Sequence, residues 1–386
     1  MRSAPLSRTL ISVLILVSTA AVTGAQKTPP VVENGFNGSL RRPPELVLQA
    51  TAGVEGPEEG MFMRPLAMLV SPVGDLYVSD MMAHAVLVYG PDGKFKRRIG
   101  KEGSGPGELQ MPAGIYLAWN GELVVPDPQN GRTNYFSPQG EFLRSEGNNT
   151  GGVVLISGLV GRIRTVPGQY LRNGPMVLPF MQQGTADPTG GKEPKLIEVV
   201  DEAGQVLRTF GDRVPNEDAN LANMVNQVEL AWHPSGKVLA SFRLNNELHV
   251  YDAATGTLER IIRRRTAFTP REPKMDLQEQ RGAEGQVMLS LRANVDPITL
   301  AAAFDPQGRI WALTRILGAE ETDQKEEAGD YTGLVRLEVF DTEGKLLAGI
   351  PLDEPADRMV FAPDGSLWLL DAQFTASARR FTIRWP

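Results

Sequence analysis

The chain has 386 residues, a formal net charge of −7 and no cysteine. The missing cysteines exclude disulfides, thiolate metal sites and a cysteine nucleophile. The acidic balance argues against a nucleic-acid partner, because contacts to phosphates need a basic face.

The N-terminal residues 1–25 are expected to be a removable signal peptide. Arg2 and Arg8 precede a short apolar run, Leu10–Val17, and Thr23–Ala25 forms a small-residue cleavage site. No stretch reaches the roughly 20 apolar residues that cross a bilayer, so no membrane span is expected. We therefore expect an exported protein, periplasmic or extracellular.

One long segment of the chain occurs twice. Residues 65–100 recur without a gap as residues 112–147, and each copy divides into four short apolar runs separated by turns of the Pro-x-Gly type. A self-match at such a period indicates a repeat array. Four short strands cannot bury both faces alone, whereas a ring of four-stranded sheets can, so the pattern predicts a β-propeller. The positions that match are Pro65 with Pro112, Gly74 with Gly121, Asp80 with Asp127, Pro91 with Pro138, Gly93 with Gly140, and Phe95 with Phe142.

The remaining runs extend this pattern to six blades. Residues 26–44 are interpreted as a flexible lead-in and residues 45–386 as the propeller, with further blades over residues 158–211, 228–263, 299–350 and 358–385. The last blade lacks a fourth strand, and Glu45–Gln49 resembles the outer strands of other blades. Because open sheet edges are normally covered, we predict that this N-terminal strand pairs with the last blade and closes the ring. The predicted fold class is therefore an all-β, six-bladed propeller with four-stranded blades.

Insertions are unevenly distributed between the two faces of the predicted ring. Turns between first and second and between third and fourth strands are short. The long insertions join second to third strands, or blade to blade, and therefore emerge on the opposite face; they are Asn173–Pro194, Asp212–Gln227, Arg264–Pro297 and Gly318–Thr332. A short helix is expected within Met275–Leu291. Long loops on a scaffold usually carry function, so this loop face is the predicted binding face.

The blades resemble the six-bladed propellers of the NHL-repeat type from about Glu45 to the C-terminus. The resemblance is carried by Gly105–Leu109 with Pro112, by Gly74–Asp80, and by Val86–Tyr89 leading into Pro91-Asp92-Gly93. It implies the propeller fold and no single activity, since one fold hosts many functions.

Some NHL-like propellers are lyases or lactonases that hold a divalent metal with polar side chains of the innermost strands. Here those strands, such as Leu66–Val70, Gly114–Ala118 and Thr299–Phe304, are almost wholly apolar. The three histidines, His84, His233 and His249, are interpreted as structural and too far apart in sequence to suggest a metal pair. We therefore predict no catalytic residue, no metal and no cofactor. A metal-dependent lyase or lactonase remains the alternative.

Charged residues lie at or beside the ends of the second strands, at the mouth of the predicted channel on the loop face. Asp80, Asp127 and Asp371 fall in blades one, two and six, and Arg172, Arg243 and Arg315 fall in blades three, four and five. One interpretation is structural: each Asp accepts backbone hydrogen bonds, and each Arg pairs with a nearby carboxylate, Glu320 or Glu321 in the case of Arg315. The other is that the arginines receive an anionic group of a ligand.

The preferred function is a binding scaffold. Its partner would be a protein, a peptide or a carbohydrate on the loop face, and the scaffold is expected to be monomeric.

Overall fold

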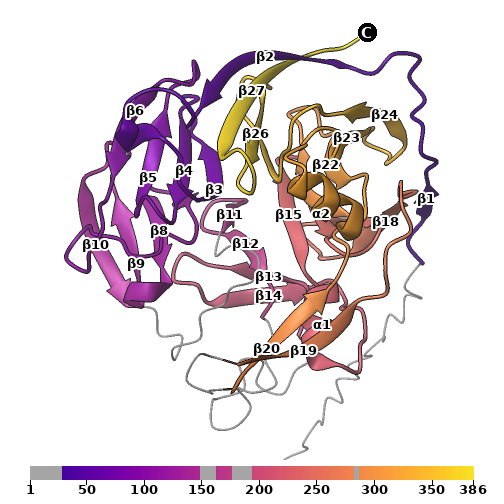
Figure 1. Ribbon diagram of the computed structural model, residues 1–386, viewed down its shortest axis with the longest axis horizontal. Helices are drawn as coiled ribbons and strands as arrows, with labels where there is room; N and C mark the ends of the chain where they lie inside the picture. Colours follow the sequence, from indigo (N-terminus) through magenta and orange to yellow (C-terminus); the bar gives the residue numbers. More distant parts are fainter. Residues whose placement is uncertain (1–27, 148–161, 176–193, 282–286) are drawn as a thin grey trace, which may run out of the picture.

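The computed structural model describes residues 28–147, 162–175, 194–281 and 287–386. These residues form six blades, each built on four antiparallel strands, arranged as a ring (Figure 1). The helical segments of the described residues are short: η1 (Glu58–Gly60), η2 (Pro128–Asn130), α1 (Ala219–Val225) and α2 (Ala319–Glu327). The predicted all-β, six-bladed propeller is confirmed.

The blades follow one another along the chain. Blade 1 contains β3 (Pro65–Val70), β4 (Leu76–Asp80), β5 (Ala85–Tyr89) and β6 (Phe95–Ile99). Blade 2 contains β7 (Tyr116–Leu117), β8 (Leu123–Asp127), β9 (Arg132–Phe136) and β10 (Phe142–Gly147). Blade 3 contains β11 (Ile163–Arg164), β12 (Tyr170–Asn173), β13 (Ile197–Val200) and β14 (Val206–Phe210).

The second half of the ring repeats the arrangement. Blade 4 contains β15 (Val228–His233), β16 (Lys237–Phe242), β17 (Glu247–Asp252) and β18 (Leu258–Arg263). Blade 5 contains β21 (Thr299–Phe304), β22 (Ile310–Arg315), β23 (Val335–Phe340) and β24 (Leu346–Pro351). Blade 6 contains β25 (Arg358–Phe361), β26 (Leu367–Asp371), β27 (Ser377–Arg384) and β2 (Glu45–Ala52).

The hydrophobic core lies between neighbouring blades. Trp311 and Leu313 of blade 5, for example, belong to one buried cluster with Leu367 and Leu369 of blade 6. Because side chains alternate along a strand, each blade offers one apolar face to the blade before it and one to the blade after it. Each blade is therefore stabilised mainly by its two neighbours, and a closed ring leaves neither end blade exposed.

The short turns have the chemistry that the Pro-x-Gly pattern predicts. Gly93 in the turn before β6 has a φ of 77°, a conformation that glycine adopts without strain. A Cβ atom at this position would also lie 2.3 Å from the carbonyl oxygen of Thr51 in blade 6. The glycine therefore serves both the turn and the close approach of the neighbouring blade.

The N-terminal strand closes the ring, as predicted. β2 pairs antiparallel with β27, from Glu45 opposite Arg384 to Ala52 opposite Ala378. Blade 6 thus contains strands from both ends of the chain, and its outer edge is provided by the N-terminal segment.

A second N-terminal contact was not predicted. Within the segment interpreted as a flexible lead-in, β1 (Val31–Glu33) pairs in parallel with β18, the outer strand of blade 4. Asn34 then bridges blades 4 and 5, because its side-chain amide donates to the Gly344 carbonyl and its oxygen accepts from the Leu346 amide. Residues 31–40, which we name the strap, run along the outer side of these two blades on the way to β2 (Figure 1).

The strap approaches blade 5 too closely for a side chain at Gly38. An added Cβ would lie 2.1 Å from the Leu347 carbonyl oxygen, whereas at Gly35 no atom lies within 4 Å. We expect Gly38→Ala to lower the free energy of unfolding by about 1–3 kcal/mol, because the backbone must shift. Gly35→Ala is the matched control and should change it by less than about 0.5 kcal/mol. Urea denaturation measures both, and equal values would show that the strap is not held against blade 5.

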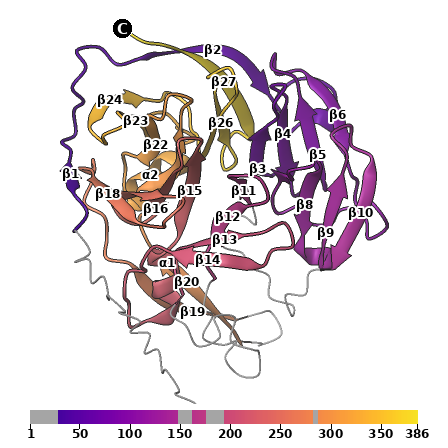
Figure 2. The same ribbon diagram turned by 180° about the vertical axis from the view of Figure 1, so that it is seen from behind.

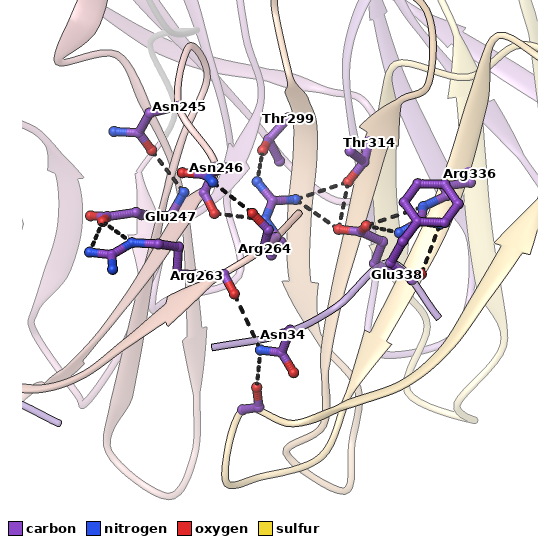
Figure 3. Close-up of polar contacts among 12 residues, drawn as sticks. Asn34, Asn245, Asn246, Glu247, Arg263, Arg264, Thr299, Thr314, Arg336 and Glu338 are labelled. Atoms are coloured by element: carbon purple, nitrogen blue, oxygen red, sulfur yellow. Dashed lines mark hydrogen bonds and ion pairs between the residues drawn. The ribbon is translucent and has the colours of Figure 1, made fainter. Parts of the chain in front are cut away.

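A buried polar network joins blades 4 and 5 beneath the strap (Figure 3). The guanidinium of Arg264 donates to Thr314 and lies 3.0 Å from a carboxylate oxygen of Glu338, and both charged side chains are at most 3% exposed. The other carboxylate oxygen of Glu338 accepts from Arg336, whose guanidinium lies over the Phe36 ring of the strap. Each charge in this network is paired, which buried charges require.

The connection between blades 4 and 5 differs from the sequence-based expectation. The helix expected within Met275–Leu291 is wrong, because this region forms an antiparallel hairpin of β19 (Lys274–Arg281) and β20 (Val287–Asn294). The hairpin contacts α1 and projects from the ring beside it (Figure 2).

Candidate functional site: the loop-face mouth

The charged residues predicted at the channel mouth lie at the ends of second strands. Because second strands end, and first strands begin, on the same face of every blade, these residues surround the axis on the face that also carries α1, α2 and the β19–β20 hairpin. We name this position the loop-face mouth; its predicted members are Asp80, Asp127, Arg172, Arg243, Arg315 and Asp371.

The three aspartates hold the loops that frame the mouth. Each carboxylate is almost fully buried and accepts hydrogen bonds from backbone amides of its own blade's loops. This is the arrangement that the structural interpretation requires, while a role toward a ligand stays a prediction. The donating amides are those of Met63, Arg64 and Ala83 for Asp80, of Gln110 and Met111 for Asp127, and of Gln373, Phe374 and Thr375 for Asp371.

Arg172 is also engaged within its own blade. Its Nε atom lies 2.6 Å from a carboxylate oxygen of Glu198, the residue directly opposite it on β13. Arg172 therefore pairs with a nearby carboxylate, as the structural interpretation expects. A contribution of Arg172 to a ligand site stays a prediction.

Arg243 and Arg315 are placed side by side by one residue between blades 4 and 5. The amide of Ile298 donates to the carbonyl of Arg243, and the carbonyl of Ile298 accepts from the amide of Arg315, each at 2.8 Å. The two backbones thus flank the start of the inner strand β21. Neither guanidinium makes a hydrogen bond or ion pair with another residue of the described part of the chain.

Burial affects both of these arginines. Desolvation lowers the pKa of Arg243 from its usual value, and the nearby charge of Glu229 opposes that effect. Desolvation likewise lowers the pKa of Arg315, against the charges of Glu326 and Asp323 on α2. The expected partners of Arg315, Glu320 and Glu321, form no ion pair with it. Both side chains remain partly exposed, so a guanidinium without a carboxylate in contact is accessible and suited to receive one.

Three further charged residues of the mouth were missed by the sequence analysis. Arg358 begins β25, Asp357 precedes it, and Glu229 lies near the start of β15. Glu229 lies opposite Ser241, two residues before Arg243, and Arg358 is 4.0 Å from Asp357 in blade 6. The charges of all three residues act on Arg243. The sequence signal that could have identified these residues is a charged residue at or next to the first position of an inner strand. It was missed because the middle of those strands is apolar.

Asp357 is buried, and one of its two carboxylate oxygens accepts no hydrogen bond from a described residue. One oxygen accepts from the Ala372 amide at 3.3 Å, and the Arg358 guanidinium is 4.0 Å away. Burial raises the pKa of Asp357 above its usual value, and the charge of Arg358 opposes this shift. The mouth therefore contains partly desolvated cationic and anionic side chains with few direct contacts between them.

The donor set does not fit the divalent metal that the enzymatic NHL-like propellers imply. Among residues 28–147, 162–175, 194–281 and 287–386, no three His, Cys, Asp or Glu side chains come together as a metal site would require. The histidines contact protein groups instead: His84 the Gln110 carbonyl, His233 the Ser235 hydroxyl and His249 the Glu247 carboxylate. We derive no metal-dependent chemistry for this site.

No helix in the described residues is long and apolar enough to cross a membrane.

Comparison with known proteins supports the fold. A family model described as a 6-bladed beta-propeller (DUF5128) matches residues 67–145. A solved structure of a DUF4221 family member from Bacteroides vulgatus aligns with a TM-score of 0.55 and 10% identity, covering 88% of this chain and 98% of that chain. A protein of Bacteroides fragilis, provisionally described as exported, aligns with a TM-score of 0.55 and 8% identity, covering 92% and 99%.

The other comparisons add no activity. A streptogramin B lyase aligns with a TM-score of only 0.44 and 13% identity, covering 88% of this chain and 98% of that chain, which is too low to support an argument. No curated protein matches the sequence. The chain is therefore similar to known proteins as a six-bladed β-propeller.

Proposed function

We propose that this protein is an exported binding scaffold of the NHL-repeat type, and that its loop-face mouth receives an acidic group of the ligand through Arg243 and Arg315. The ligand is a protein, peptide or carbohydrate that carries this group. Export rests on the signal-peptide features of residues 1–25, which lie outside the described part of the chain.

The observation that carries the proposal is the state of the two arginines. Both are partly buried, and no described carboxylate contacts either of them. Guanidinium groups match carboxylate and phosphate geometry with two parallel hydrogen bonds, and these bonds are strong where water is excluded. By contrast, the buried Arg264 is fully paired with protein groups and is better explained as structural.

The test is calorimetric titration of the mature protein with butyrate and succinate as acidic probes. We expect Arg243→Gln and Arg315→Gln each to weaken binding by about 10- to 100-fold, because a hydrogen bond to a charged group contributes about 1.5–3 kcal/mol. The melting temperature should stay the same or rise, since each change removes a partly buried charge without a partner.

Arg384→Gln is the matched control. This arginine is 66% exposed and 3.9 Å from Glu45, so its loss should leave both probe binding and stability unchanged. Unchanged probe affinity in the two mouth variants, or a loss of folding in them, would show that Arg243 and Arg315 are structural.

A further inference from the structure

The loop-face mouth contains acids as well as arginines, and this mixture defines the ligand further. We infer that the ligand is zwitterionic, with an ammonium group close to the acidic group that Arg243 and Arg315 receive. The inference rests on the proposed function, because it concerns the same site.

The donors and acceptors at the mouth that lack partners are of both kinds. Arg243 and Arg315 offer hydrogen-bond donors only, since a guanidinium has no acceptor. Glu229 and one oxygen of Asp357 offer acceptors only, and neither receives a hydrogen bond from another described residue. Asp371 differs, because its own loop already occupies both oxygens. A ligand that satisfies all the free groups must therefore bring both acceptors and donors.

The local balance of charge points the same way. Around blades 4 to 6 the mouth contains three arginines (Arg243, Arg315 and Arg358) and three acids (Glu229, Asp357 and Asp371), and the charges of Asp323 and Glu326 on α2 act on Arg315. A simple anion would be attracted by the arginines and repelled by the acids. A zwitterion gains from both, because its ammonium group compensates the acids while its carboxylate compensates the arginines.

Glu229 is the side chain best placed to hold the ammonium group. It lies on β15 directly opposite Ser241, two residues before Arg243, and its charge acts on Arg243. Glu229 and Arg243 thus lie on neighbouring segments of blade 4, and Ile298 places Arg315 of blade 5 beside Arg243. This arrangement suits a part of the ligand in which the ammonium group and the acidic group are separated by a few bonds.

The experiment uses three probes of equal chain length: butyrate with an anionic group only, butylammonium with a cationic group only, and 4-aminobutyrate with both. The same calorimetric titration is performed on the mature wild-type protein and on Glu229→Gln. We expect the wild type to bind 4-aminobutyrate at least ten-fold more tightly than either singly charged probe. In Glu229→Gln the affinity for 4-aminobutyrate should fall to that for butyrate, while butyrate binding stays the same or improves.

Further variants distinguish a failure of this inference from a failure of the proposed function. Asp357→Asn should reduce the preference for 4-aminobutyrate as well, and Glu343→Gln, an exposed glutamate on the opposite face, should not. Equal wild-type affinity for butyrate and 4-aminobutyrate, or a preference that survives both acid substitutions, would overturn this inference and leave the proposed function standing. If neither carboxylate probe binds, the proposed function itself is wrong.

Discussion

A chain that begins at Ala50 is expected to melt at least roughly 10 °C below the full mature protein, or to aggregate. This truncation removes most of β2, which pairs with β27 over the length of blade 6. The lost ladder hydrogen bonds, at about 1 kcal/mol each, amount to several kcal/mol. The exposed edge of β27 would in addition offer unpaired backbone groups to other chains.

Shorter truncations provide the controls for this result. A chain that begins at Pro43 keeps β2 and loses the strap, so its melting temperature should lie between those of the two other chains. A chain that begins at Thr28 keeps both and should melt like the mature protein. Differential scanning calorimetry distinguishes the three. Equal melting temperatures for all of them would contradict closure of the ring by the N-terminal segment.

The Glu338→Gln substitution is expected to lower the free energy of unfolding by about 3–5 kcal/mol, because it leaves buried guanidinium groups without their counter-charge. Glu338 is 2% exposed and lies between Arg264 and Arg336 in the network that joins blades 4 and 5 (Figure 3). Urea denaturation followed by tryptophan fluorescence measures the change.

An exposed pair serves as the comparison for this substitution. Glu343→Gln breaks the pair with Arg260, in which the glutamate is 72% exposed, and should cost less than about 1 kcal/mol. If Glu338→Gln cost no more than Glu343→Gln, the network would be hydrated rather than buried between the blades.

Ring closure could be predicted from two independent features of the sequence. The last blade was one strand short, and Glu45–Gln49 matched the outer strands elsewhere. The strap could not be predicted, since β1 has only three residues and no partner nearby in sequence. Its pairing depends on Asn34 and Phe36 meeting blades 4 and 5, which are far away along the chain.

The β19–β20 hairpin shows a pattern that was misread. Met275 and Leu277 alternate with polar residues, as do Leu289 and Leu291, and this period of two is typical of strands. The glycines between the two segments suit a hairpin turn and not the middle of a helix. The expectation of a short helix within Met275–Leu291 did not take this period of two into account.

The candidate site was predicted in part. The ends of the second strands are fixed by the repeat, so the positions of Arg243 and Arg315 followed from blade assignment alone. Arg358 and Glu229 were missed because the repeat indicates where inner strands run and not which of their residues reach the axis. Which arginines already have a partner is likewise a property of contacts between strands, as the pair of Arg172 with Glu198 shows.

A crystal structure of the mature protein with 4-aminobutyrate at a saturating concentration would show directly whether the loop-face mouth binds a zwitterion. We expect the carboxylate of the probe within hydrogen-bonding distance of both the Arg243 and the Arg315 guanidinium groups, with its ammonium group directed toward Glu229. A probe bound elsewhere, or arginines that contact carboxylates of the protein and leave the mouth closed to a ligand, would show that this site is not the binding site.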